Sequence, residues 1–131
     1  MWQWLCYDDG DEEDLWTRWY RGVDDAVQGK HDTIIEYLEV RSAGEWREPH
    51  TKKIENDIIE VRIHGNVQHR LFGFFGPKQG EFTFVLPCIH KQNVYTPKGA
   101  KKTAAKRKLA IEAGEANVRR CKRPQKTEDS E

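Results

Sequence analysis

Apolar and polar residues alternate in short runs between residues 57 and 91, which is the pattern of half-buried β-strands. Turn residues separate the runs at Gly65 and again between Gly76 and Gly80, so this segment predicts an antiparallel meander. The expected strands are Asp57–Ile63, Val67–Phe75 and Phe82–Leu86. A further strand is expected near the amino terminus, where bulky and smaller residues alternate over Trp2–Tyr7.

Two helices are expected between the first strand and the meander. The first would be capped by Asp11 and end at Gly29, and the second would begin at Asp32 and stop at Gly44. Such neighbours form an αα-hairpin, which we expect over one face of the sheet. The tryptophan-rich stripe of the first helix is interpreted as core. Its apolar residues recur at helical spacing: Leu15, Trp16, Trp19, Tyr20, Val23, Ala26 and Val27.

The pairing of the first two meander strands decides which residues stand opposite each other. A three-residue loop centred on Gly65 places Glu60 opposite Arg70, whereas a two-residue loop brings Arg62 opposite His69. We prefer the first pairing because it sets opposite charges across the ladder. The more apolar face should then meet the helical hairpin, and the arginines should lie on the other face. That polar face would hold Glu60, Arg62, Gln68 and Arg70.

A basic helix is expected after the meander. Thr96 would cap it with Pro97 in its first turn, and Gly114 would end it. The remaining residues, 115–131, show no periodicity, so we predict a single domain over residues 1–114 followed by a disordered polar and basic tail. The expected fold class is α+β. Cationic side chains line most of this helix: Lys98, Lys101, Lys102, Lys106, Arg107 and Lys108.

Charge is divided unevenly along a chain that is neutral in total. Residues 1–60 hold 16 acids and 7 bases, while residues 61–131 hold 15 bases and 6 acids. This division favours a nucleic-acid surface on the basic half, although the two halves can also neutralise each other. The chain has no apolar run of about 20 residues and no signal-peptide pattern at its start, so we expect a cytoplasmic protein without a membrane partner.

Cofactor chemistry is not expected. Cys6, Cys88 and Cys121 are far apart and form no C-x-x-C pair, so free thiols are expected, and neither a metal nor a cofactor. RNA cleavage by a 2′-hydroxyl requires instead a base, a cation beside the phosphorane and an acid. Arginine suits the second role because its fork matches phosphate oxygens. The alternative is a structural ion pair of the arginines with Glu60. The candidate set is Glu60, Arg62, Arg70, His90, Lys91 and Tyr95.

Three segments, IIEVRI, HRLFGFF and IHKQNVYTPKGA, resemble the HigB-type branch of the RelE/ParE toxin superfamily, including its phage-derived relatives. The resemblance implies a RelE-like fold in which Trp2–Tyr7 pairs with Asp57–Ile63. It also implies the toxin of a type II toxin–antitoxin system, a ribosome-dependent messenger-RNA endonuclease. Its partners would be the ribosome, mRNA and a helix-turn-helix antitoxin.

The chemistry of the residues and the resemblance together give the expected roles. Catalysis is assigned to Arg62, Arg70, His90, Lys91 and Tyr95, with Glu60 in support. RNA binding is assigned to Lys98, Lys101, Lys102, Lys106 and Arg107. Two alternatives stay open. One is a non-enzymatic, phage-derived factor that binds a host protein through the acidic, Trp-rich N-terminal half, and the other is a gyrase-directed toxin of the ParE type.

Overall fold

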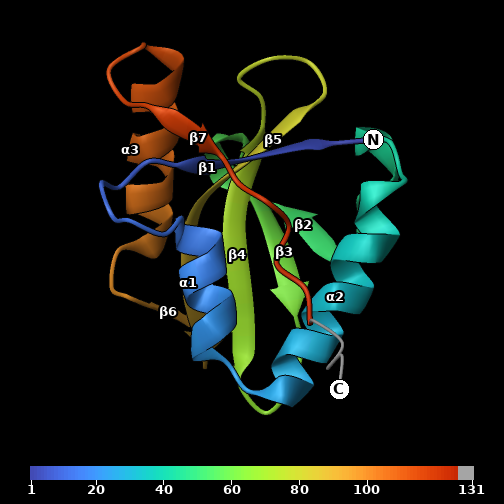
Figure 1. The fold of residues 1–131 in the computed structure, drawn as a ribbon. Coiled ribbons are helices and arrows are strands. Elements are labelled where there is room, and N and C mark those ends of the chain that lie inside the picture. The colour runs from blue at the N-terminus through green and yellow to red at the C-terminus, as the bar shows by residue number, and fades with distance from the viewer. Residues whose placement is uncertain (127–131) are drawn as a thin grey trace.

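One mixed β-sheet with helices on both faces makes up the computed structural model, which describes residues 1–126 (Figure 1). The expected α+β class is confirmed. Within the described residues the elements are, in chain order, β1 (Gln3–Tyr7), α1 (Leu15–Gly22), α2 (Asp25–Glu39), β2 (Thr51–Lys53), β3 (Ile59–Ile63), β4 (Gln68–Phe75), β5 (Glu81–Lys91), β6 (Val94–Thr96), α3 (Ala100–Glu112) and β7 (Val118–Arg120), with 3₁₀ turns at Ala43–Glu45 and Glu55–Asp57.

The sheet order is β2-β3-β4-β5-β1-β7, and β6 forms a hairpin with β5. β1 therefore lies between β5, to which it is parallel, and β7, to which it is antiparallel (Figure 1). The expected pairing of Trp2–Tyr7 with Asp57–Ile63 is wrong. Both sides of β3 are already occupied, by β4 and by the short strand β2.

The helical hairpin forms, but its break lies earlier than expected. α1 ends at Gly22, and Asp24 caps α2 by accepting a hydrogen bond from the backbone N–H of Val27. Gly29, the expected end of the first helix, lies inside α2. One internal glycine costs about 1 kcal/mol, which an N-cap of similar strength offsets. Asp14, rather than Asp11, caps α1.

Two separate cores lie on the two faces of the sheet. The core beneath α1 and α2 is rich in aromatic rings, and Trp16 is fully buried in it, so the interpretation of the tryptophan stripe as core is confirmed. The core beneath α3 is built from smaller residues together with Phe72 and Phe74. Gly73 allows β4 and β5 to approach each other at a β-bulge, because a Cβ there would lie 2.5 Å from Phe82 and from the Thr83 carbonyl.

The pairing of β3 with β4 differs from both expected registers. Ile63 stands opposite His69 and Arg62 opposite Arg70, so the connection is longer than three residues. Side-chain bonds stabilise this longer loop, since Gln68 donates to the Gly65 carbonyl at 2.7 Å. The shift from the preferred register is two residues, and an even shift leaves every side chain on the same face. Arg62 and Arg70 consequently lie on the α3 face of the sheet, away from the helical hairpin.

Three expectations for the C-terminal third of the chain are wrong. β5 continues past Leu86 to Lys91, and Thr96 lies in β6 rather than capping a helix. α3 begins at Ala100, with Gly99 in the left-handed conformation as its N-cap (φ 75°). The expectation of disorder from residue 115 is wrong for Val118–Arg120, which forms β7. The expectation for residues 127–131 lies outside the described residues.

Candidate functional site

Glu60 is the centre of a charged cluster on the α3 face. Its side chain is only 1% exposed, and it comes from β3, whose alternation places it between the apolar side chains of that face. Its carboxylate accepts a hydrogen bond from Arg62 Nε at 2.7 Å and another from the Tyr95 hydroxyl. A buried carboxylate is stable when its lone pairs are satisfied in this way.

Arg62 is the member of the cluster that reaches solvent. Its side chain is 20% exposed, and a second carboxylate, Glu48, lies 3.3 Å from its Nη1. The backbone is fixed as well, because the Arg62 N–H donates to the His50 carbonyl at 2.8 Å. A guanidinium on a rigid strand with its Nε already used can still present its outer N–H groups to a phosphate.

Arg70 lies deeper, with a side chain 6% exposed and its Nε 3.7 Å from Glu60 Oε1. One terminal nitrogen donates to the His69 carbonyl at 3.0 Å, while the buried Nε has no hydrogen-bond partner among the described residues. Burial lowers the pKa of Arg70, and the charge of Glu60 opposes that shift. Two guanidiniums share one buried carboxylate here, so the inner cluster keeps one unit of positive charge.

Tyr95 and His90 form the aromatic edge of the cluster. Their strands are paired, and their rings stack with centroids 4.5 Å apart. Phe72 packs against the other side of Tyr95 at 5.3 Å. Burial and the hydrogen bond to Glu60 raise the pKa of the Tyr95 hydroxyl, so it stays protonated at neutral pH and acts as a donor.

The candidate lysines differ in their exposure and in their contacts. Lys101 lies 5.3 Å from the Tyr95 ring centroid and also pairs with Glu55 at 3.2 Å. Lys91 is exposed at the end of β5, beyond the stacked pair. The exposed cations of the α3 region are Lys98, Lys102 and Lys106.

Arg107 has a structural environment instead. It donates to the Val85 carbonyl at 2.7 Å, and its guanidinium lies 4.4 Å from the centre of the Tyr7 ring. These contacts attach α3 to β5 and β1. The structure therefore brings together Glu60, Arg62, Arg70, His90 and Tyr95, places Lys101 beside Tyr95, and directs Arg107 into the fold.

Sequence reasoning did not anticipate three neighbours of the cluster. Glu48 and Glu55 come from the irregular segment before β3, where no periodicity indicates which way a side chain points. Cys88 stands opposite Arg70 across the ladder, and burial followed by the charge of Glu60 raises its pKa to about 12. The alternation of β5 could have placed Cys88 beside His90, had the strand been expected to continue past Pro87.

A hollow lies beside the aromatic edge of the cluster. The hollow nearest to His90 and Lys91 has a volume of about 380 Å³ and is bordered by the tips of two hairpins, residues 66–68 and 89–93. Among residues 1–126, no helix is both long and apolar enough to cross a membrane.

The architecture, an N-terminal helical hairpin and a C-terminal helix on a mostly antiparallel sheet, is consistent with a RelE-like fold. The family described as "Phage derived protein Gp49-like (DUF891)" matches residues 18–109. The chain belongs to this Gp49-like family, which is a RelE-like, toxin-like family. Neither a curated protein nor a solved structure matches the chain.

Proposed function

We propose that this protein is a toxin of the HigB-type branch of the RelE/ParE superfamily and cleaves messenger RNA on the ribosome. The observation that carries the proposal is the cluster around Glu60, in which a partly exposed Arg62 stands beside a stacked histidine and tyrosine. Membership of a RelE-like, phage-derived family supports it. The basic residues of the α3 region supply a surface for the RNA backbone.

Cleavage would proceed by attack of a ribose 2′-hydroxyl on the adjacent phosphorus, with departure of the 5′-oxygen. Arg62 would stabilise the charge on the phosphorane through its outer N–H groups. His90 would accept the proton of the attacking 2′-hydroxyl and return it to the departing 5′-oxygen. Tyr95, which stays protonated and donates its hydrogen bond to Glu60, would hold that carboxylate and the stacked His90 in place beside the reacting phosphate. Lys91 is assigned to the same site from the sequence resemblance alone.

Arg70 takes a different role in this proposal from the one expected from the sequence. Its guanidinium is nearly enclosed and lies against Glu60, so it would position the carboxylate that in turn holds Arg62 and Tyr95. It is a positioning residue. The exposed lysines Lys98, Lys102 and Lys106, together with Lys101, would bind phosphates and so provide affinity that falls with salt.

Induction in bacteria tests the activity directly. Growth should stop, and new transcript ends should appear in translated messages. Arg62→Ala should reduce cleavage about a hundredfold while the protein stays folded. Lys78→Ala is the matched control, since Lys78 is an exposed cation in the turn between β4 and β5. Normal growth with intact transcripts after induction of the folded wild-type chain would overturn the proposal.

The proposed partners are the ribosome, mRNA and a helix-turn-helix antitoxin. Co-expression of a small helix-turn-helix protein encoded beside this gene should restore growth and co-purify with the chain. If no neighbouring gene product restores growth, the toxin–antitoxin assignment loses its support.

Binding of a host protein is the competing function, and the acidic loop before α1 is the observation in its favour. Asp8–Asp14 holds six carboxylates. Trp4, Trp16 and Trp46 are buried, whereas Trp2 and Trp19 are partly exposed and would be the tryptophans available to such a docking surface. Recovery of a stoichiometric host protein, without RNA cleavage in the same cells, would favour this alternative.

A further inference from the structure

Cys6 and Cys121 meet in the core beneath the helical hairpin, although 115 positions separate them in the sequence. Their sulfur atoms lie 2.7 Å apart, and both thiols are free. Cys6 is fully buried in β1, and Cys121, which directly follows β7, is 8% exposed. The third cysteine, Cys88, is buried in the other core, on the opposite face of the sheet.

The strand pairing explains why the two thiols meet. Cys6 stands opposite Arg119 in the antiparallel pair of β1 and β7. The N–H of Cys121 donates to the Trp4 carbonyl at 3.2 Å, which continues the same ladder by one step. Trp4 and Cys6 share a face of β1, so Cys121 is the diagonal neighbour of Cys6 on that face.

We propose that Cys6 and Cys121 form a redox-active dithiol site, which small disulfides such as oxidised glutathione convert into an intramolecular disulfide bond. The inference is independent of the proposed nuclease activity, because the site lies on the opposite face of the sheet from the Glu60 cluster. The reaction balances, because two protein thiols are oxidised while one glutathione disulfide is reduced to two thiols.

The order of the two exchange steps follows from exposure. Cys121 is the more accessible thiol, so its thiolate attacks a sulfur of the glutathione disulfide, and the first glutathione leaves as a thiolate. Cys6 then loses its proton and attacks Cys121 Sγ in the mixed disulfide, which forms the Cys6–Cys121 bond and releases the second glutathione thiolate. The two protons pass to the two glutathione thiolates. Burial, followed by the contact with Cys121, raises the pKa of Cys6, so Cys6 is the poorer first nucleophile.

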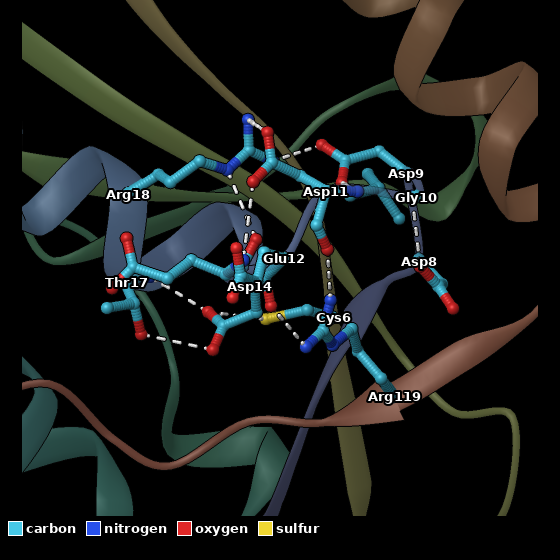
Figure 2. A network of polar contacts seen from close by, with 12 residues as sticks. Cys6, Asp8, Asp9, Gly10, Asp11, Glu12, Asp14, Thr17, Arg18 and Arg119 are labelled. Carbon is cyan, nitrogen blue, oxygen red and sulfur yellow. Dashed lines mark hydrogen bonds and ion pairs between the residues drawn. The ribbon is translucent and has the colours of Figure 1, made fainter.

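A metal site is the competing use of the same atoms. Asp14 Oδ1 lies 3.6 Å from Cys6 Sγ, and Cys6, Asp14 and Cys121 together offer three ligand atoms within 4.8 Å of one another. However, Asp14 already caps α1, since its carboxylate accepts from the Thr17 N–H at 2.8 Å and from the Thr17 hydroxyl at 3.0 Å (Figure 2). Structural zinc requires four ligands, and the described residues provide no fourth one at this place.

The disulfide would attach the start of the C-terminal segment, residues 121–126, covalently to β1. Beyond Cys121, Arg123 pairs with Glu39 at 2.8 Å, and the Lys126 N–H donates to Asp32 at 3.1 Å. In Figure 1 the red C-terminal segment accordingly runs from β7 towards α2. Oxidation would add a covalent bond at the start of a segment that is otherwise attached by β7 and a few polar contacts.

Peptide mapping tests the site without any substitution. The folded, reduced chain is treated with oxidised glutathione, its remaining thiols are alkylated, and a digest is analysed by mass spectrometry. The expected product is a linked Cys6–Cys121 peptide, with Cys88 recovered in alkylated form. The same oxidation in denaturant should yield all three possible pairs, because the fold no longer selects one. Recovery of Cys6 and Cys121 only as thiols or mixed glutathione disulfides from the folded protein would overturn the proposal.

Thermal unfolding provides the second measurement. Oxidation should raise Tm by about 10 °C in the wild type and in Cys88→Ser, because the bond closes a loop of most of the chain. Cys121→Ser should show no rise, and Cys121→Ala serves if the serine variant does not fold. Zinc bound in one equivalent to the reduced wild type and lost in Cys121→Ser would identify a metal site instead and overturn the dithiol assignment.

Discussion

The two faces of the sheet are covered by different side chains, with large aromatic rings on one face and small residues beside a charged cluster on the other. Beneath α1 and α2, aromatic rings contact one another directly, and the ring centroids of Trp16 and Phe84 lie 4.3 Å apart. Beneath α3, the helix contributes the small buried residues Ala100 and Ala104. The hairpin thus closes its face with an apolar core, whereas α3 leaves room on its face for the charged cluster around Glu60.

The two faces are therefore expected to contribute differently to the stability of the fold. Rings of large area gain most from burial, so the hairpin face is expected to dominate the free energy of folding. The α3 face contains a buried carboxylate with two arginines, an arrangement that is costly to desolvate and weak as a stabilising device. The Glu60 cluster is therefore expected to contribute less to stability than the aromatic core of the hairpin face.

The largest expected effect comes from breaking the aromatic face. Trp16→Ala should lower the free energy of unfolding by about 3–5 kcal/mol, because it leaves a cavity against Phe84 and removes the donor to His31. Urea unfolding measures the loss. Val40→Ala, at an exposed position just after α2, should change stability by less than about 0.5 kcal/mol. Equal effects of the two substitutions would contradict the assignment of stability to this face.

Breaking the charged cluster should cost somewhat less. Glu60→Ala leaves Arg70 buried without its carboxylate, and the expected loss in urea unfolding is about 3 kcal/mol. Glu60→Gln, which keeps the shape and an acceptor, should be milder. Glu55→Ala removes an exposed partner of Lys101 and should have almost no effect. A Glu60→Ala protein as stable as the Glu55→Ala protein would mean that the cluster is not coupled.

The hairpin face should also respond to acid through His31. Burial lowers the pKa of His31 to about 4, and its Nε2 accepts from Trp16 at 2.9 Å, which a protonated ring cannot do. Between about pH 6.5 and pH 4 the unfolded chain therefore binds the extra proton, and this contribution to stability is lost as the pH falls.

The expected slope is up to about 1.4 kcal/mol per pH unit in that window. Urea unfolding at a series of pH values measures it, and His31→Gln should flatten the profile. A wild-type profile as flat as that of the variant would show that His31 is not the titrating group.

The smallest effect distinguishes the surface of the α3 face from its buried cluster. Lys102→Gln should leave stability within about 0.5 kcal/mol and reduce the salt dependence of ribosome binding by about one phosphate contact. Binding measured across a series of salt concentrations gives the slope. Lys78→Gln should leave that slope unchanged, and a loss of cleavage without a change in slope would contradict a purely backbone-binding role for Lys102.

The faces of the meander could be predicted from the sequence, but the pairings could not. Alternation alone assigns Glu60, Arg62 and Arg70 to one face, and the face assignment survives a shift of two residues. The register depends on the loop around Gly65, whose stabilising bond from Gln68 has no sequence signature. The charged pair that favoured Glu60 opposite Arg70 forms diagonally instead.

Long-range partners were the least predictable part of the fold. The alternation of Trp2–Tyr7 identifies a strand, yet nothing in those residues indicates β5 rather than β3 as its neighbour. β7 is three residues long, which is too short for a periodic pattern to be recognised. The meeting of Cys6 with Cys121 depends on both of these pairings, so cysteine spacing could not reveal it.

The position of β1 inside the sheet has a consequence for biosynthesis. Residues 3–7 leave the ribosome long before their two neighbours, β5 and β7, have been made. Until then Trp4 and Cys6 have no strand to pair with, and their apolar side chains remain open to chaperones or to other nascent chains. Closure of the sheet must await contacts of high sequence separation, a topology that slows folding. The β3–β4–β5 meander is therefore expected to form first, with β1 inserted between β5 and β7 as the concluding step.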